Sequence, residues 1–97
     1  MPRRPCIYLL ASRKHGTLYL GVTSNIAERL ETHRRGQGSK FAKKYHAKRL
    51  VYVELHDTMP AAIQREKQMK TWKRAWKVQL VEQVNPEWDD LSRLHLT

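Results

Sequence analysis

The chain has few cysteines, few acidic residues and no long apolar run. Its 97 residues contain a single cysteine, Cys6, which excludes an internal disulfide and a zinc site built from cysteines. No apolar stretch is long enough to cross a bilayer, and the initial Met-Pro-Arg-Arg is not followed by a signal-peptide pattern. We therefore expect a soluble, cytoplasmic protein that has no membrane partner.

The sequence also lacks linkers and internal repeats. No stretch is rich in Pro, Gly and Ser, and a chain of 97 residues supports one modest hydrophobic core. These features predict a single domain that spans residues 1–97.

The shortage of acids leaves a strong positive charge. Lys and Arg number 19 against 9 Asp and Glu, for a net charge of +10. Residues 1–49 hold 12 basic and 2 acidic side chains, whereas residues 50–97 hold 7 of each. Such a surplus favours a polyanionic partner, although charge alone does not separate a phosphate-binding surface from a solvated face.

Two tyrosines lie in a predicted hairpin with strands at 6–12 and 17–22. If Ser12 pairs with Thr17, Tyr8 lies opposite Gly21 and shares one face of the sheet with Tyr19. A half-residue shift of the turn would send Tyr19 to the other face. The glycine leaves room beside the paired phenols, which indicates a site.

The rest of the chain predicts four helical segments and one more strand. Asn25 and Glu28 are typical of the start of a helix. Pro60 is typical of the first turn of a later helix. We expect an α+β fold in the order ββααβαα, with a small three-stranded antiparallel sheet flanked by helices. The tail from Glu87 should pack by Trp88 and otherwise be exposed. The expected segments are helices at 25–36, 60–73 and 75–84, a helical turn at 39–45 and a strand at 50–55.

The first long helix carries two polar side chains beside its buried stripe. Ile26 and Leu30 mark that stripe, and Arg29 and His33 lie alongside it at i and i+4. Such groups either extend to solvent or line a pocket at the edge of the stripe. The helical pattern leaves both interpretations open.

Glu66 is the only acid between residues 59 and 80, where every other charge is basic. It either neutralises its neighbours or binds a metal ion. Magnesium keeps most of its waters and accepts one or two protein carboxylates, so one glutamate suffices if a phosphate completes the coordination.

Taken together, these residues resemble the GIY-YIG nuclease superfamily. The resemblance consists of Tyr8 on the first strand, Tyr19-Leu20-Gly21 on the second, Arg29 and His33 on one helix, and Glu66 after a third strand. More narrowly, the basic helix at 65–70 and Asn-Pro-Glu-Trp at 85–88 are similar to small single-domain bacterial GIY-YIG proteins.

The resemblance implies a catalytic role for Tyr8, Tyr19, Arg29, His33 and Glu66. Glu66 would be the ligand of a divalent metal, Mg2+ or Mn2+, and Arg29 would bind the scissile phosphate. Tyr8 or His33 would help to deprotonate water, and the family pattern leaves the two open. Tyr19 would orient that water or the phosphate.

We therefore expect a metal-dependent endonuclease that hydrolyses phosphodiester bonds in nucleic acid, with DNA as its partner. One active site cuts one strand, so a double-strand break requires a homodimer or two nicks, and targeting would rely on structure or a protein partner. The alternatives are a non-catalytic nucleic-acid-binding module of the same fold and a protein-interaction domain. The residues expected to bind nucleic acid are Arg29, Arg34, Arg35, Lys40, Lys43 and Lys44.

Three positions depart from the family pattern or match it weakly. Cys6 replaces the first glycine of the motif that names the family, and Val22 stands where some relatives have a lysine. Asn85 is a weak counterpart of an asparagine that some members place near the site.

Overall fold

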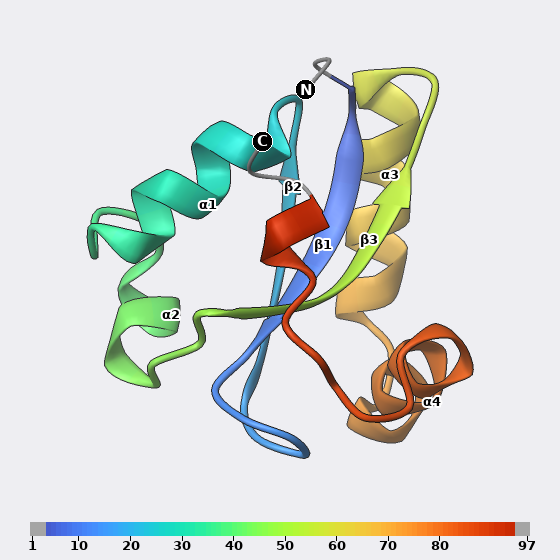
Figure 1. Cartoon of the computed structure of the whole chain (residues 1–97). Helices are drawn as coiled ribbons and strands as arrows, with labels where there is room; N and C mark the ends of the chain where they lie inside the picture. Colours follow the sequence, from blue (N-terminus) through green and yellow to red (C-terminus); the bar gives the residue numbers. More distant parts are fainter. Residues whose placement is uncertain (1–3, 95–97) are drawn as a thin grey trace.

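A computed structural model describes residues 4–94 and has the α+β fold and element order predicted from the sequence (Figure 1). Both the order and the three-stranded antiparallel sheet are confirmed. Within residues 4–94, no helix combines the length and apolar character needed to cross a bilayer. The elements are β1 (Cys6–Ala11), β2 (Leu18–Thr23), α1 (Ile26–Arg34), α2 (Lys40–Lys44), β3 (Arg49–Leu55), α3 (Met59–Lys70), α4 (Arg74–Val84) and the 3-10 turn η1 (Ser92–Leu94).

The hairpin has the predicted register. The amide of Ser12 donates to the carbonyl of Thr17 at 3.1 Å, and Tyr8 pairs with Gly21. Because side chains alternate along a strand, this register places Tyr8 and Tyr19 on the same face. β1 is the central strand, so β2 and β3 are the two edges of the sheet.

A bulge in β3 turns two consecutive side chains to one face of the sheet. Leu9 pairs with Tyr52 but Leu10 pairs with Leu50, so Val51 is the extra residue. Val51 and Tyr52 consequently both pack in the same core cluster, where alternation would have separated them.

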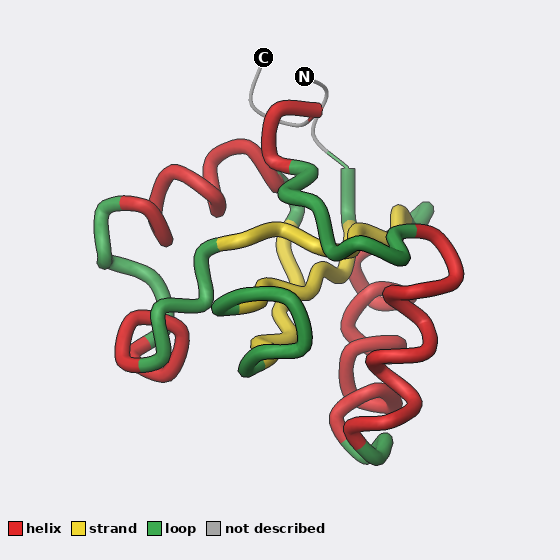
Figure 2. Tube along the Cα trace, turned by 60° about the horizontal axis from the view of Figure 1, so that its bottom comes forward, coloured by secondary structure: helices red, strands yellow, loops and turns green. Residues whose placement is uncertain are grey.

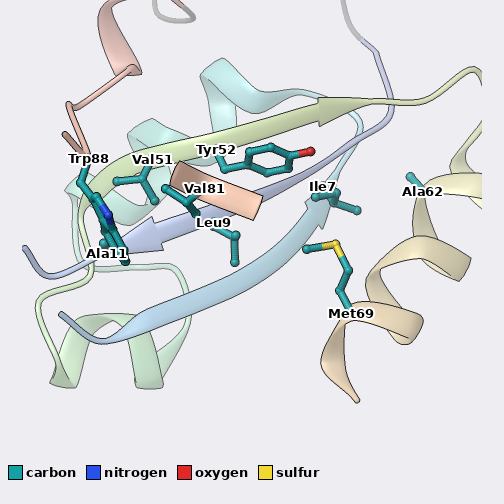
Figure 3. Close-up of a cluster of buried hydrophobic side chains, with 9 residues drawn as sticks. All are labelled: Ile7, Leu9, Ala11, Val51, Tyr52, Ala62, Met69, Val81 and Trp88. Carbon is teal, nitrogen blue, oxygen red and sulfur yellow. The ribbon is translucent and has the colours of Figure 1, made fainter. Parts of the chain in front are cut away.

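Both faces of the sheet are covered, because α1 and α2 lie on one side and α3 and α4 on the other (Figures 1 and 2). Figure 3 shows the larger core, in which β1 and β3 side chains meet those of α3, α4 and the tail. Each large apolar side chain buried there contributes about 1.5–3 kcal/mol. The buried residues of this cluster are Ile7, Leu9, Ala11, Val51, Tyr52, Ala62, Met69, Val81 and Trp88.

The helix boundaries differ slightly from the predicted ones. Asn25 caps α1 as expected, and its side chain accepts a hydrogen bond from the amide of Glu28 at 3.2 Å. α1 ends at Arg34, and Gly36 follows with a positive φ of 72°. α3 ends at Lys70 rather than at residue 73, because Lys73 is extended and forms the N-cap of α4.

The tail is more closely packed than the sequence predicted. Trp88 is fully buried as expected, but Ser92 is also buried, so the expectation that the rest of the tail is exposed was wrong. The amide of Leu91 donates to the carbonyl of Leu50 at 2.8 Å, and the Leu50 amide donates to Asp90 at 3.3 Å. These bonds satisfy backbone groups at the open edge of β3.

Candidate active site

A cleft of about 350 Å³ runs along β2, the edge strand next to the central strand. Side chains from both faces of the sheet reach it, together with residues from all four helices. The residues that line it are Tyr8, Leu18, Tyr19, Leu20, Gly21, Val22, Arg29, Phe41, Glu66, Lys70 and Lys77. The cleft thus brings together four of the five side chains that the sequence singled out for catalysis.

The two tyrosines come from neighbouring strands and differ in burial. Tyr8 is almost fully buried and Tyr19 partly exposed, with ring centroids 6.3 Å apart. Gly21 leaves the space that Tyr8 occupies, because a Cβ at this position would collide with the Tyr8 hydroxyl. The predicted room opposite Tyr8 therefore holds the phenol itself.

His33 lies behind Tyr8 rather than on the wall of the cleft. Its Nε2 is 3.2 Å from the Tyr8 hydroxyl oxygen, within hydrogen-bond distance, and the residue is only 7% exposed. Gly38 packs against the other side of the imidazole, where a Cβ would collide with Nδ1. The ring is thus held between the phenol and a close turn of backbone.

Burial changes the acidity of both groups. It raises the pKa of Tyr8, helped by Tyr19, and the positive charge of Arg29 only partly offsets this. Burial also lowers the pKa of His33 below 6.5, as does the charge of Arg29. At neutral pH the pair is therefore a neutral phenol beside a neutral imidazole.

Arg29 and Glu66 approach the cleft from different helices. Arg29 lies on α1, one turn before His33, and its side chain is exposed. Glu66 lies on α3, where only 13% of its side chain is exposed and Lys70 Nζ is 3.2 Å from its carboxylate. Among the described residues that line the cleft, Glu66 is the only acid, facing three cations.

The donor set around Glu66 fits a hard cation that keeps its water. No group of three or more His, Cys, Asp or Glu side chains within residues 4–94 is arranged to hold a metal ion. A single carboxylate is nevertheless sufficient for Mg2+ when waters and a substrate phosphate supply the other oxygens. The three cations of the cleft suit such a phosphate.

The other basic residues predicted to bind nucleic acid divide into two groups. Arg34 donates a hydrogen bond to Ser92 at 3.2 Å and thus lies against the tail, and Arg35 pairs with Glu31. Neither arginine is among the residues that line the cleft. The second group lies on α2, the helix that carries the cleft residue Phe41, and its side chains are exposed: Lys40, Lys43 and Lys44.

Three charged or aromatic residues of the cleft were not predicted as site residues from the sequence. Lys70 had a recognisable signal, since it is at i+4 from Glu66. Lys77 and Phe41 had none, because their approach depends on the angle between α3 and α4 and on the position of α2.

The structure shows where the two residues that depart from the family pattern lie. Cys6 is fully buried, so it fills core space on β1, while Val22 lines the cleft. Asn85 is buried away from the cleft lining, where its amide donates to the carbonyls of Val51 and Asp89. It therefore joins α4 and the tail to the bulge of β3.

Comparisons with known proteins agree with this geometry. The sequence profile of the GIY-YIG catalytic domain matches residues 4–79. The UPF0213 proteins SAV0488 and SA0446 of Staphylococcus aureus strains Mu50 and N315 are each 38% identical over 68 residues, which is 70% of this chain and 83% of theirs. The solution NMR structure of the UPF0213 protein BH0048 from Bacillus halodurans superimposes with a TM-score of 0.56 at 26% identity, covering 97% of this chain and 99% of that one.

Proposed function

The chain belongs to the GIY-YIG family, and from this premise we propose that it is a metal-dependent endonuclease that hydrolyses phosphodiester bonds in DNA. The observation that carries the proposal is the cleft that Tyr8, Tyr19, Arg29 and Glu66 line together, with His33 directly behind Tyr8. These groups supply the three requirements of phosphodiester hydrolysis, namely a base, a cationic phosphate contact and a metal ligand.

Tyr8 and His33 act as one proton acceptor. A free phenolate is disfavoured at Tyr8, because burial raises the pKa of this phenol. The Tyr8 oxygen therefore takes a proton from the attacking water as its own proton passes to His33 Nε2, 3.2 Å away. The neutral imidazole, with its lowered pKa, is free to accept that proton and later returns it to solvent.

Arg29 and Tyr19 position the phosphate in this proposal. The guanidinium of Arg29 binds the phosphate oxygens and stabilises the negative charge that grows as the water oxygen bonds to phosphorus. The bond from phosphorus to the leaving sugar oxygen then breaks, and that oxygen takes a proton from solvent. The Tyr19 phenol orients the attacking water.

Glu66 would hold the divalent metal, Mg2+ or Mn2+. When bound, the ion supplies a Lewis acid that polarises the phosphoryl group. Lys70 pairs with the Glu66 carboxylate at 3.2 Å and would have to release it for the carboxylate to serve as a ligand. Lys70 and Lys77 then remain beside the phosphate as further cationic contacts.

Nicking of supercoiled plasmid in Mg2+ or Mn2+ tests this proposal. Arg29→Ala and Glu66→Ala should each slow nicking by about 10²–10³-fold, the effect of removing one preorganised electrostatic contact. The control is Glu31→Ala, which removes an exposed acid that pairs with Arg34 and Arg35 outside the cleft. Equal cutting by wild type and both variants would place the activity in a contaminant or another site.

The second candidate function is a non-catalytic nucleic-acid-binding module of the same fold. One observation favours it: among the described residues of the cleft, the only acid, Glu66, is already paired with Lys70. Under this alternative the protein binds DNA with steep salt dependence but cuts neither duplex, branched nor single-stranded substrates with either metal. The absence of cutting together with retained binding would replace the nuclease assignment.

A further inference from the structure

Helix α2 presents two aromatic side chains to solvent beside the cleft. Phe41 is 46% exposed and Tyr45 is 42% exposed, and their ring centroids are 4.8 Å apart with an angle of 47°. Ala42 is the one buried residue of this five-residue helix. Leaving two large rings in water forgoes the stabilisation that their burial would give, which points to a role outside the fold.

These rings continue a line of aromatic side chains that starts in the cleft. The Phe41 centroid is 6.4 Å from that of Tyr19, with the ring planes only 30° apart. Phe41 also lines the cleft, whereas Tyr45 does not. Tyr19, Phe41 and Tyr45 thus lead from the proposed reaction centre to the outer surface, and we call these three residues the aromatic path.

The surroundings of the aromatic path are cationic. Lys44 Nζ lies over the Tyr45 ring at 5.5 Å from its centroid, and Lys40 and Lys43 are exposed on the same helix. No Asp or Glu occurs between Glu31 and Glu54 in the sequence. Flat apolar faces among cations match a ligand that has flat rings and negative charges at regular intervals.

We propose that the aromatic path binds unpaired bases of a nucleic-acid strand, so that the substrate carries single-stranded nucleotides next to the cleaved phosphate. This proposal rests on the nuclease function, since it describes the substrate of the same cleft. Bases inside a duplex are stacked on each other, and only unpaired bases offer a free face to Phe41 and Tyr45. The lysines of α2 contact the accompanying phosphates.

Binding measurements without catalysis test the proposal directly. The protein carrying Glu66→Ala is titrated in EDTA with a single-stranded oligonucleotide containing 2-aminopurine, and with the same strand in a duplex. Stacking should quench the fluorescence of the single strand and not that of the duplex. Phe41→Ala and Tyr45→Ala should each weaken single-strand binding roughly ten-fold, the size expected for one lost stacking contact.

Two further variants separate stacking from other effects. Phe41→Tyr keeps the ring and should retain the quenching, whereas Trp76→Ala removes another exposed aromatic residue, on α4, and should leave binding unchanged. Circular dichroism checks that each variant is folded. Equal single-strand affinity in Phe41→Ala, Tyr45→Ala and the parent, or an equal loss in Trp76→Ala, would overturn the proposal. The proposal would also fail if Phe41→Ala and Tyr45→Ala lost binding to vesicles of phosphatidylcholine and phosphatidylserine but kept their affinity for the oligonucleotide.

Failure of this inference and failure of the nuclease function give different results. Wild-type protein that cuts plasmid but shows no quenching would keep the nuclease function and remove the aromatic path from substrate binding. Quenching that is lost in Phe41→Ala, with no cutting of any substrate, would keep base binding and remove catalysis. If the nuclease function and base binding by the aromatic path are both correct, a DNA flap or junction should be cut at least several-fold faster than a blunt duplex of the same sequence.

Discussion

The hydroxyl of Tyr8, on the central strand, lies 3.2 Å from Nε2 of His33, on α1. The sheet register orients the phenol and the first helix orients the imidazole, so neither segment alone specifies the contact. Tyr8 lines the cleft and His33 does not, so under the nuclease proposal a proton from the cleft reaches the imidazole through the phenol. The proposal accordingly gives the two residues different roles, whereas the sequence left open which of them accepts the proton.

The lowered pKa of His33 predicts how stability depends on pH. Below pH 6.5 the unfolded imidazole takes up a proton that the folded one still resists, so the free energy of unfolding should fall with decreasing pH. The fall ends once pH has dropped below the folded pKa. Urea denaturation between pH 7.5 and 5 should show this slope, and His33→Asn should reduce it. An NMR titration of His33 with a midpoint above 6.5 would contradict the prediction.

Gly38→Ala should disable the Tyr8–His33 pair. A Cβ at residue 38 would collide with the His33 ring, so the imidazole must shift away from the phenol. We expect a loss of about 1–3 kcal/mol in the free energy of unfolding and, under the nuclease proposal, at least ten-fold slower nicking. Thermal melting and plasmid nicking measure the two effects. Gln37→Ala, at the exposed neighbour, is the control and should behave like wild type.

Lys70→Met should increase the affinity of Glu66 for metal. The variant removes the ammonium that pairs with the carboxylate at 3.2 Å. Because Lys70 is exposed, the pair is worth at most about 1 kcal/mol, and the Mn2+ dissociation constant should fall no more than about five-fold. Titration calorimetry with Mn2+ alone, without DNA, measures this change. The matched control is Lys67→Met on the same helix, and an equal increase there would mean a general charge effect.

The Arg65–Glu54 pair should stabilise the fold without serving the cleft. Arg65 donates to both carboxylate oxygens of Glu54, at 2.9 and 3.2 Å, and neither residue lines the cleft. Burial alone would raise the Glu54 pKa, but bonds from Arg65, Tyr52 and His56 lower it below 4.5. Arg65→Met should therefore cost about 1–3 kcal/mol in urea denaturation.

The pH dependence of the Arg65 effect has a defined sign. The stabilisation should be fully present above pH 4.5 and disappear as pH falls through the lowered pKa of Glu54. Lys67→Met serves as the exposed control on α3, with a change within about 0.5 kcal/mol. Unchanged stability in Arg65→Met would mean that the carboxylate finds other partners.

The α2 lysines should account for part of the salt dependence of nucleic-acid binding. Each phosphate contact that is lost should reduce the slope of log affinity against log salt by about 0.7–0.9. We expect this for Lys40→Gln and Lys43→Gln, measured by fluorescence anisotropy. Lys14→Gln is the control because Lys14 is paired with Glu87 at 2.9 Å. A flat salt response of the wild-type protein would instead favour a protein-interaction domain.

Short-range patterns were enough to predict the fold, whereas the candidate site came from the resemblance to the GIY-YIG superfamily. The turn spacing fixed the hairpin register, and the Asn25 cap fixed the start of α1, because both depend on residues a few positions apart. The predicted end of α3 was less accurate, since nothing local distinguishes Lys73 as an extended residue. Tail packing was missed for a related reason, because Asp90 and Leu91 bond to a strand some 40 residues earlier.

The sequence predicted which residues form the candidate site better than it predicted how they are arranged. The sequence indicated that Tyr8, Arg29 and Glu66 belong together, but not that His33 lies behind the phenol. That detail depends on how α1 packs against the sheet and on Gly38, whose missing side chain leaves room for the His33 ring. The aromatic path depends likewise on where α2 packs.

The central position of β1 has a consequence for how the site holds its shape. Tyr8 has a strand on either side, lying opposite Gly21 of β2 and Val53 of β3, and only 1% of the residue is exposed. Hydrogen exchange at its amide should therefore require global opening of the protein. Under the nuclease proposal, the sheet therefore fixes the position of the phenol, whereas Arg29 and Glu66 reach it from helices α1 and α3.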